Sequence, residues 1–286
     1  MQNVAVISDS LSCIPRQLID RYGIVIVPIR IIVQGKVYRD MVDITPSEAY
    51  ELFLKNSDQF STSPSSPGQY IEAYRESAKF ARSILCVTVS ARISTAYNVA
   101  RLARDQAKSH SPDLDIVVLD SQTVTASEGF IALAAAKVAA EGEELGEVVK
   151  AAERVREKVS FFAFLDTVKH VYRTGRAPKI AADVASMLDI KPILTTSAGA
   201  VRLKTIARNR EQGENRLLEI MRARVGDAPV HVAVMHAYAP ERAERLKQRV
   251  SCAFDCVELL VCEFSPVMGY ATGTDALGLA FYAEEA

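Results

Sequence analysis

The first half of the chain alternates between two hydrophobic patterns. Runs rich in apolar and β-branched residues predict buried strands, and segments in which apolar residues recur at helical spacing predict helices between them. The predicted strands cover residues 4–8, 24–33, 83–90 and 115–121. The predicted helices cover residues 15–22, 46–55 and 94–108, and a long alanine-rich helix follows Thr125. Strands joined through helices need crossover connections, so this half predicts a mainly parallel sheet with flanking helices.

The second half, after the apolar run SFFAFL, has a different pattern. Four segments have the composition of strands: residues 190–197, 200–207, 230–237 and 256–264. The first two bracket Ala198-Gly199 and predict a hairpin, whereas a helix that begins at Pro240 separates the last two. This combination predicts a mixed sheet. We therefore expect an α/β protein of two domains, with an N-terminal domain at 1–156 and a C-terminal α/β domain at 157–286.

Three predicted helices begin with a capping box, in which a hydroxyl residue is followed three positions later by Glu or Gln. The boxes are Thr45 with Glu48, Ser66 with Gln69, and Thr125 with Glu128. The second box ends an uncharged stretch, residues 59–70, that contains five serine and threonine hydroxyls and could be a flexible linker or a polar cup. Because unpaired N–H groups and the helix dipole favour an anion at a helix N-terminus, we favour the cup.

Further hydroxyls follow the carboxyl ends of several predicted strands. They are Ser8, Ser10 and Ser12 after the first strand, Ser90, Ser94 and Thr95 after the third, and Ser121, Thr123 and Thr125 after the fourth. Ligands of open parallel sheets bind beyond these strand ends. Ordinary helix capping explains any one of these hydroxyls. The whole set predicts a site for a small anionic head group.

Composition and charge narrow the functional classes. The chain has 286 residues, of which 49% are hydrophobic, and a formal net charge of −1. This balance indicates a globular protein and argues against a nucleic-acid binder or a membrane-surface protein. The first residues lack the pattern of a signal peptide, and the apolar runs are too short to span a bilayer. We therefore expect a cytoplasmic protein without a stable membrane anchor.

The five cysteines do not suggest a disulfide framework or a metal site. Their number is odd, and the one close pair, Cys252 and Cys256, has no second pair or histidine nearby in the sequence. We expect buried, reduced thiols.

Known catalytic motifs are missing from the sequence. It contains neither a Gly-x-Ser-x-Gly elbow nor a Walker-type phosphate loop. The four histidines, none with metal-ligand spacing, are His110, His170, His231 and His236. The last two lie five residues apart on one predicted strand, which places them on opposite faces. Four aspartates could ligate a cation but are typical of caps and turns: Asp9, Asp40, Asp43 and Asp120.

From these observations we expect no metal, no cofactor and no catalytic residues. The alternative is a small-molecule hydrolase or phosphotransferase that uses the hydroxyl-rich strand ends, although nucleophilic catalysis needs a base held against the nucleophile.

Taken in order, the segments resemble the DegV family of bacterial fatty-acid-binding proteins over nearly the whole chain. Eight stretches carry the resemblance: Ser8-Asp9-Ser10, Tyr38 with Asp40, Thr62-Ser63-Pro64-Ser65, VSARISTAYNVA at 89–100, LDSQTV at 119–124, Thr174-Gly175-Arg176, IKPIL at 190–194 and PVMG at 266–269. Each stretch is weak alone, but eight in the family's order are specific.

The resemblance implies a protein that encloses one long-chain fatty acid between its two domains and has no catalytic machinery of its own. It also implies that the bound carboxylate is presented to a separate fatty acid kinase, which converts it to an acyl phosphate. Thr62 and Ser94 are implied as carboxylate contacts. The expected ligand-binding residues are Thr62, Ser63, Ser94, Thr95, Phe164, Met268, Ala271 and Thr272. The basic residues expected to dock the partner are Arg173, Arg176, Arg202 and Arg208.

The chain departs from the family pattern at one end of the expected site. Ala271 stands where the family usually has a histidine after Pro-Val-Ile-Gly, and Asp275 replaces the last glycine of Thr-Gly-Pro-Gly. Ser94-Thr95-Ala96-Tyr97 likewise stands in place of Ser-Gly-Thr-Tyr. An imidazole can donate to a carboxylate, and alanine cannot. Either hydroxyls and backbone amides suffice for the head group, or the head group differs from a free carboxylate.

Overall fold

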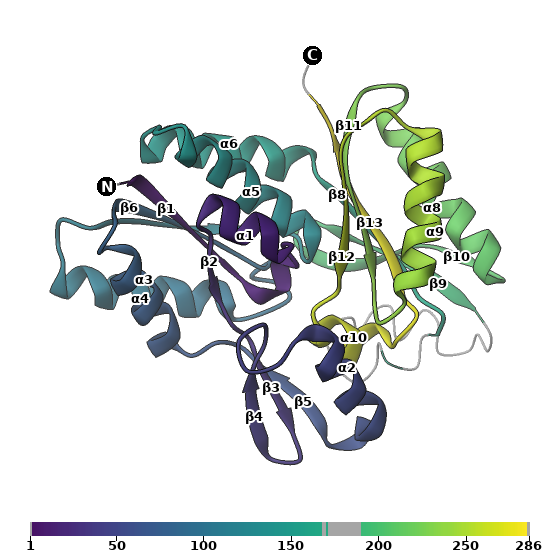
Figure 1. Ribbon diagram of the computed structural model, residues 1–286, viewed down its shortest axis with the longest axis horizontal. Coiled ribbons are helices and arrows are strands. Elements are labelled where there is room, and N and C mark those ends of the chain that lie inside the picture. The colour runs from purple at the N-terminus through teal and green to yellow at the C-terminus, as the bar shows by residue number, and fades with distance from the viewer. Residues whose placement is uncertain (1, 168–169, 171–189, 285–286) are drawn as a thin grey trace.

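Four parallel strands form the sheet of the N-terminal part, in the order β2-β1-β6-β7 (Figure 1). The computed structural model describes residues 2–167, 170 and 190–284 of the chain. The strands are β1 (Gln2–Asp9), β2 (Val25–Val27), β6 (Ala81–Thr88) and β7 (Asp115–Asp120). The helices around this sheet are α1 (Arg16–Tyr22), α3 (Pro67–Ser77), α4 (Ala96–His110), α5 (Ala126–Ala140) and α6 (Leu145–Lys158). The predicted parallel sheet with flanking helices is confirmed.

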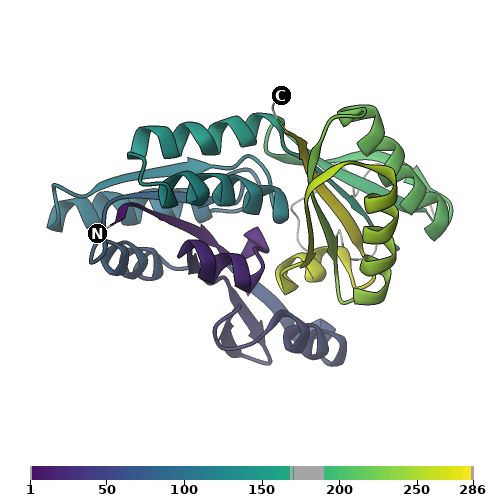
Figure 2. The same cartoon turned by 45° about the horizontal axis from the view of Figure 1, so that its top comes forward.

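Alternate residues of these strands pack against helices on opposite faces, as expected for a sheet that is buried on both sides. Along β1, Val4 and Val6 belong to the core that contains α5 and α6, whereas Ala5 and Ile7 pack with α3 and α4. Figure 2 shows α5 and α6 on one side of the sheet and α3 and α4 on the other.

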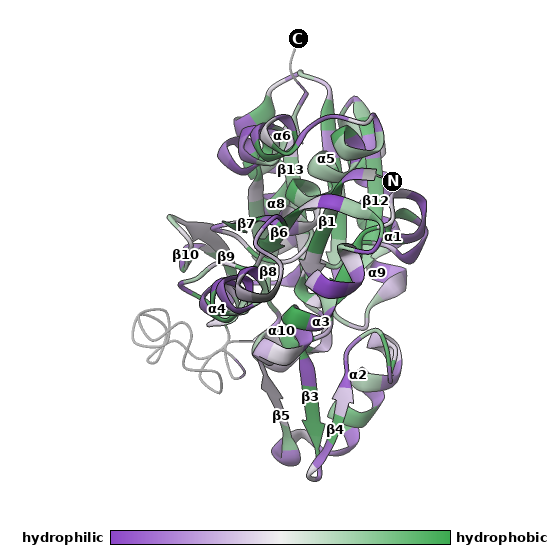
Figure 3. Cartoon of the chain, turned by 90° about the vertical axis from the view of Figure 1, so that its left-hand side faces the viewer, coloured by the Kyte–Doolittle hydropathy of each residue, from purple (hydrophilic) through white to green (hydrophobic). Residues whose placement is uncertain are grey.

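A second, three-stranded antiparallel sheet was not predicted. It consists of β4 (Lys36–Arg39), β3 (Arg30–Val33) and β5 (Phe60–Ser63), in that order, and α2 (Pro46–Lys55) and the short helix η2 (Ser57–Gln59) lie between β4 and β5. The apolar run 24–33 therefore contains two strands that belong to different sheets and separate at Pro28. We call residues 30–63 the small unit, which projects from the rest of the molecule in Figure 3.

The polar stretch 59–70 is consequently not all loop. Its residues 60–63 form β5, where Phe60 is buried and Ser61 is exposed. The strand was missed because only long-range pairing with β3 identifies it, at positions such as Ile31 opposite Thr62. A four-residue strand with three hydroxyl residues has little hydrophobic pattern of its own.

The C-terminal part contains a six-stranded mixed sheet, in the order β10-β9-β8-β13-β11-β12. The strands are β8 (Ser160–Phe164), β9 (Lys191–Ser197), β10 (Ala200–Ala207), β11 (Val230–His236), β12 (Cys256–Glu263) and β13 (Leu277–Ala283). Only β11 and β12 pair in parallel, so the predicted mixed sheet is confirmed. Helices α8 (Arg210–Val225) and α9 (Pro240–Ala253) cover its outer face, and the short helix α10 (Pro266–Thr272) follows β12. The chain reaches this sheet just after α6 ends at Lys158.

The predicted hairpin at Ala198-Gly199 is confirmed. The strands β9 and β10 pair antiparallel, with Ser197 opposite Ala200. The two turn residues both have positive φ, 46° at Ala198 and 78° at Gly199. This is the backbone of a type I′ turn, which matches the twist of the flanking strands.

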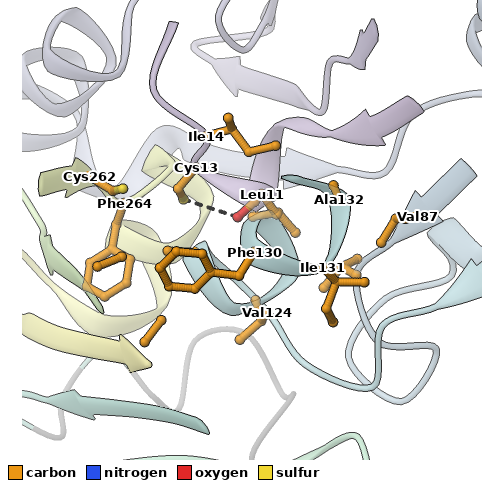
Figure 4. Packing of buried hydrophobic residues seen from close by; sticks show 14 of the residues in the cluster. Leu11, Cys13, Ile14, Val87, Val124, Phe130, Ile131, Ala132, Cys262 and Phe264 are labelled. Atoms are coloured by element: carbon orange, nitrogen blue, oxygen red, sulfur yellow. Dashed lines mark hydrogen bonds between the residues drawn. The ribbon is translucent and has the colours of Figure 1, made fainter. Parts of the chain in front are cut away.

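Helix α5 lies in a core shared by both sheets. Its side chains are apolar almost all round, and most are buried between β1 on one side and β13 on the other. Phe130 of α5, Phe264, which precedes α10, and Leu11 and Cys13, which follow β1, belong to the same cluster of buried hydrophobic residues (Figure 4). One continuous hydrophobic cluster therefore joins the two parts of the chain.

Two of the three predicted capping boxes are present, at Thr45 with Glu48 and at Ser66 with Gln69. The third is wrong. Thr125 has a φ of 61°, and its hydroxyl donates to the carbonyl of Val124 instead of capping α5. Glu128 is fully buried and accepts a hydrogen bond from Ser8 Oγ at 3.3 Å. Because α5 begins inside the core, tertiary contacts replace the local cap.

All five cysteines are free, and Cys13, Cys86 and Cys262 are buried as expected. The expectation of burial is wrong for Cys252, which is exposed, and Cys256 is half-buried. Among the helices that the structure describes, none is long and apolar enough to cross a membrane.

Candidate functional site

A cavity lies where the carboxyl ends of the parallel strands face the inner side of the mixed sheet. Its described lining comes from the segments after β1, β6 and β7, from the small unit and the residues on either side of it, from β8 to β10, and from α10. The lining residues are Leu11, Ile29, Thr62, Ser63, Pro64, Ile93, Ser94, Val124, Phe161, Ala163, Leu194, Val201, Val267, Met268, Ala271 and Thr272. The set is largely apolar and carries no charged side chain. This is a surface suited to a hydrocarbon chain, with a few uncharged hydroxyls for a polar group.

The cavity is narrow, with a volume of about 70 Å³. A long acyl chain therefore requires lining side chains to move. Met268 is well suited to this because its unbranched thioether side chain adopts many shapes at low cost.

Strand β8 shows which of its aromatic residues face the cavity. Phe161 and Ala163 line it, because alternate residues of a strand point to the same side. Phe162 and Phe164 point to the outer face and belong to the core beneath α8. The ring of Phe164 lies against Gly213, where a Cβ atom would come within 2.1 Å of it. The structure therefore does not bring Phe164, an expected ligand contact, into the cavity.

Thr62 is a polar residue of the lining whose hydroxyl has no partner among the described residues. Its side chain lies on the face of β5 that also carries the buried Phe60, toward α10. Across the described ranges, no residue forms a hydrogen bond with its hydroxyl, so the donor is available to a ligand. This position fits the implied role of Thr62 as a head-group contact.

Ser63 has a structural role as well as a place in the lining. It lies directly opposite Arg30 on β3, and Arg30 Nη2 donates to Ser63 Oγ at 3.0 Å. Arg30 also donates two hydrogen bonds to the carbonyl of Pro64, at 3.0 and 3.2 Å. Further along, Ser65 Oγ donates to the carbonyl of Pro28 at 2.8 Å. Hydrogen bonds within the protein therefore fix the backbone from Ser63 to Ser65. The hydroxyl of Thr62 is the group of this stretch that remains available to a ligand.

Ser94 and Thr95 follow β6 but differ in position. Ser94 lines the cavity, and its Oγ accepts a hydrogen bond from Ala96 N at 3.3 Å, which leaves its own proton free to donate. Thr95 is exposed and forms no side-chain cap of α4. The structure brings Ser94, and not Thr95, to the site.

Helix α10 supplies the opposite wall with Val267, Met268, Ala271 and Thr272. Thr272 Oγ1 donates to the carbonyl of Met268 at 2.9 Å, so its proton is used within the helix. Ala271 contributes a methyl group at the position where the family pattern has an imidazole. The donors available from the described lining are therefore hydroxyls.

The other hydroxyl and carboxyl groups at the strand ends hold the backbone together. Asp9 accepts hydrogen bonds from Leu11 N and Val89 N, both at 3.0 Å, and so joins the ends of β1 and β6. Asp120 accepts from Ala91 N at 3.1 Å. These bonds support the caps-and-turns interpretation of the two aspartates.

Two further bonds connect the strand ends to the β9–β10 hairpin. Ser90 Oγ donates to the carbonyl of Gly199 at 2.7 Å, and the hydroxyls of Thr123 and Thr196 lie 3.1 Å apart. The hairpin belongs to the mixed sheet and, through these two bonds, contacts the carboxyl ends of the parallel strands at the edge of the cavity.

A group of buried carboxyls lies behind the cavity. Burial raises the pKa of Asp9 to about 6, although bonds from Val89 and Leu11 oppose the shift. Burial and the nearby charge of Asp9 raise the pKa of Glu128 as well. Burial also raises the pKa of Asp40 to about 6. Asp43, in contrast, forms an ion pair with Arg39 at the surface, which lowers its pKa to about 2.

His231 and His236 occupy separate places in the mixed sheet. His231 and His236 lie on opposite faces of β11, as predicted; the ring of His231 stacks on Tyr282, and His236 is buried with its pKa lowered to about 4 by burial. Throughout the described part of the chain, no group of three or more histidine, cysteine, aspartate or glutamate residues could hold a metal ion.

The expected docking residues are only partly within the described chain. Arg202 and Arg208 are exposed, on β10 and just after it. Strand β10 is at the edge of the mixed sheet, next to the hairpin that borders the cavity. Arg173 and Arg176 lie outside the described residues.

Sequence analysis missed part of the apolar lining. Leu11, Ile29, Ile93, Val124 and Val201 line the cavity but were not selected. Leu11, Ile93 and Val124 each stand next to a serine or threonine after a strand end, and that position is the signal the sequence gives for them. Ile29, just before β3, and Val201, inside β10, have no such neighbour. Their convergence depends on how two sheets pack, which the local pattern does not contain.

Comparison with known proteins is consistent across sequence and structure. The family model described as "Uncharacterised protein, DegV family" matches residues 3–284. A DegV domain-containing protein of Clostridium perfringens is 31% identical over 283 residues, which cover 98% of this chain and 99% of that protein. Another, from Streptomyces coelicolor, is 31% identical over 97% of this chain and 98% of the relative.

Two solved structures illustrate the similarity in fold. A DegV family protein from Thermus thermophilus, described in connection with fatty acid binding, has a TM-score of 0.89 and 27% identity over 99% of this chain and all of that one. DegV of Bacillus subtilis, described as a fatty acid binding protein, has a TM-score of 0.90 and 24% identity over the same shares, and it shows the likeness in fold alone.

Proposed function

The chain belongs to the DegV family, and from this premise we propose that it binds a long-chain fatty acid in the cavity between its two domains, 1–156 and 157–286. In this proposal the protein presents the carboxylate of the bound acid to a separate kinase, which forms an acyl phosphate. The observation that carries the proposal is the composition of the cavity. Its described lining is apolar except for a few hydroxyls, and one of these, Thr62, has no partner in the described protein.

An apolar lining supplies enough free energy for a lipid ligand. Burying about fourteen methylenes at about 0.8 kcal/mol each gives about 11 kcal/mol before the costs of association and ordering. The head group then needs only hydrogen-bond partners for its oxygens, so strong ionic contacts are unnecessary. Phe161, Leu194 and Val267 are examples of side chains placed to contact the acyl chain.

The head group is expected at the hydroxyls of the cavity lining. Thr62 has an unused donor, and Ser94 accepts from a backbone N–H while its own proton stays free. Two hydroxyl donors can bind the two oxygens of one carboxylate. Because no cationic side chain is in the described lining, we expect the bound acid to be held by hydrogen bonds rather than by an ion pair.

The catalytic alternative has less support. An activated nucleophile needs a base within hydrogen-bond reach. In the described lining, the hydroxyl of Ser63 contacts a guanidinium and the Pro64 carbonyl, that of Ser94 contacts a backbone N–H, and that of Thr272 contacts backbone carbonyls. This arrangement favours binding over hydrolysis or phosphotransfer by the protein itself.

The kinase partner would approach the basic edge of the mixed sheet. Arg202 and Arg208 are exposed there, and the adjacent hairpin borders the cavity. A positive surface beside the carboxylate suits an acidic partner or a phosphate in transfer. Arg173 and Arg176 complete the proposed docking set on the basis of the sequence alone.

The direct test is to identify the copurified ligand. The protein is purified from a bacterial host and denatured, and the released small molecules are analysed by mass spectrometry beside a mock purification. We expect a fatty acid of roughly sixteen carbons, the chain length assumed in the methylene estimate above. A protein that releases no lipid and also fails to bind an added fluorescent fatty acid would contradict the proposal.

A further inference from the structure

Helix α10 forms one wall of the cavity although it is very short. It contains seven residues, four of which line the cavity: Val267, Met268, Ala271 and Thr272. Isolated helices shorter than about twelve residues are marginal in water, because nucleation costs more than a few hydrogen bonds return. The position of α10, and therefore the shape of the cavity wall, must be fixed by tertiary contacts.

The start of α10 is held by a buried carboxyl from the small unit. Ser265 is the N-cap residue, and its Oγ accepts a hydrogen bond from Val267 N. The same Oγ donates to Asp40 Oδ2 at 2.7 Å. Both Asp40 and Ser265 are almost completely buried. The bond connects residues that are 225 positions apart in the chain.

Neighbouring contacts come from Tyr50 of the same unit and from Cys13, which follows β1. Tyr50 of α2 donates from its hydroxyl to the carbonyl of Phe264 at 3.1 Å. Its ring lies against Gly269 of α10, where a Cβ atom would come within 2.1 Å of it. The backbone N–H of Ser265 donates to Cys13 Sγ at 3.3 Å, and Cys13 in turn donates to the carbonyl of Leu11, as Figure 4 shows.

The small unit therefore contributes to two walls of the cavity. It carries Thr62 on β5, and it holds α10, which carries Ala271 and Thr272 (Figure 3). Among the contacts described for the start of α10, the one from Asp40 is the only one that involves a carboxylate. Hydrogen bonds to a charged group are shorter and stronger than neutral ones.

Chemistry also argues against a purely space-filling role for Asp40. Its Oδ1 has no hydrogen-bond partner in the described structure, which is costly for a buried carboxylate. A well-packed apolar pair is often at least as stable as a buried charged one. The carboxyl is therefore better explained by the direction it imposes on Ser265 than by stability.

We propose that Asp40 is a positioning residue for ligand binding: through Ser265 it fixes the N-terminus of α10, and thereby sets Met268, Ala271 and Thr272 opposite Thr62. This inference rests on the proposed function, because it assigns Asp40 a part in shaping the same cavity. Asp40 itself does not line that cavity and is not expected to touch the ligand.

The test measures the affinity of a fluorescent long-chain fatty acid for the lipid-stripped protein, at a temperature where every variant is folded. Asp40→Ala and Ser265→Ala should each weaken binding about tenfold, the size expected for one hydrogen bond to a charged group. The double variant should be no weaker than either single one, because both remove the same contact. Asp40→Asn keeps an acceptor oxygen and should stay within about threefold of the natural protein.

Ser47→Ala is the matched control. Ser47 Oγ donates to Glu263 Oε2 at 2.9 Å, so this bond also joins the small unit to the segment before α10, but it leaves the N-cap intact. We expect unchanged affinity for this variant.

Three results would overturn the inference. The first is full affinity in Asp40→Ala and Ser265→Ala with only a lower unfolding temperature, which is the signature of a merely structural role. The second is additive losses in the double variant, and the third is an equal loss in Ser47→Ala. If Asp40→Ala does not fold, Ser265→Ala and Asp40→Asn decide alone. A natural protein that binds no fatty acid would instead contradict the proposed function.

Discussion

Ser90 and Gly199 meet across the two sheets, with Ser90 Oγ donating to the Gly199 carbonyl at 2.7 Å. The contact is close because Gly199 has no side chain. A Cβ atom there would lie 2.6 Å from Ser90 Oγ. The positive φ of 78° also suits glycine, so both sterics and backbone conformation select it. This pair fixes the hairpin at the edge of the cavity.

Gly199→Ala should therefore destabilise the protein. The left-handed conformation alone costs an alanine about 1–2 kcal/mol, and the clash adds to it. Chemical denaturation monitored by circular dichroism would measure the loss. In the double variant Ser90→Ala/Gly199→Ala the clash is relieved, so the combined loss should be smaller than the sum of the single losses. A neutral Gly199→Ala would contradict the described turn.

Thr62→Val should weaken head-group binding without unfolding the protein. Valine keeps the shape but removes the donor, which leaves a carboxylate oxygen unsatisfied at a cost of about 1–3 kcal/mol. The measurement is the dissociation constant of a fatty acid. Thr95→Val is the control, because Thr95 is exposed and outside the cavity lining. If Thr62→Val and Thr95→Val change the affinity equally, Thr62 has only a structural role.

Ala271→His tests the identity of the head group. Ala271 lines the cavity on α10, so an imidazole at this position can donate to a carboxylate. For a fatty acid we expect unchanged or tighter binding, and for the corresponding fatty alcohol a smaller gain. Weaker binding of the acid, in a variant that melts normally, would indicate a different head group.

Phe161 and Phe164 provide a matched pair for the acyl chain. Phe161 lines the cavity, whereas Phe164 is completely buried on the other face of the sheet. Phe161→Ala should reduce affinity for a long acid more than for a short one. Phe164→Ala should cost about 3–5 kcal/mol of folding free energy with little effect on affinity in the folded protein. The reverse pattern would place the ligand elsewhere.

The buried carboxyls predict that part of the stability is lost as pH rises. Burial raises the pKa of Asp40 in the folded protein to about 6, above its unfolded value near 4. The folded state therefore binds more protons between these values, so the contribution of Asp40 is complete below about pH 4 and disappears as pH rises through about 6. Its size is on the order of 3 kcal/mol, because a difference of one in pKa corresponds to about 1.4 kcal/mol.

The contribution of Asp40 to the pH dependence of stability must be separated from the contributions of other titratable groups. Asp9 and Glu128 act in the same direction, whereas His236, with its lowered pKa, loses stability as pH falls from about 6.5 toward 4. The comparison is therefore between the natural protein and Asp40→Asn, unfolded by urea at several pH values from about 4.5 to about 7.5, a range that brackets the titration of Asp40. The natural protein should lose stability relative to the variant as pH rises. Parallel curves would contradict the assigned pKa.

Arg202→Glu should impair transfer to a kinase and leave lipid binding unchanged. The side chain is exposed on the edge strand β10, and it does not line the cavity. Charge reversal repels an acidic partner and slows association. Acyl phosphate formation by a cognate kinase would be measured beside the control Lys79→Glu, an exposed site on another part of the surface. Undiminished phosphorylation would contradict docking at this edge.

The sequence by itself determined the local elements and their chemistry. The hydrophobic periodicity and the spacing of strands and helices along the chain were enough to predict the parallel sheet, the mixed sheet and the hairpin at Ala198-Gly199. Two capping boxes could be predicted because a cap depends on residues three positions apart. The hydroxyls after the strands marked the edge at which the cavity lies, since parallel strands place their carboxyl ends together.

Only the tertiary structure decided which of these residues share a cavity. The choice of Phe161 over Phe164 depends on which face of β8 meets α8, and a strand pattern that is apolar on both faces does not reveal this. The hydroxyl of Thr125 does not cap α5 as predicted, because this helix begins inside the core. β5 exists through pairing with β3, a strand distant in the sequence, and Asp40 reaches Ser265 from 225 positions away. Such contacts arise from packing between distant segments, which local sequence periodicity cannot encode.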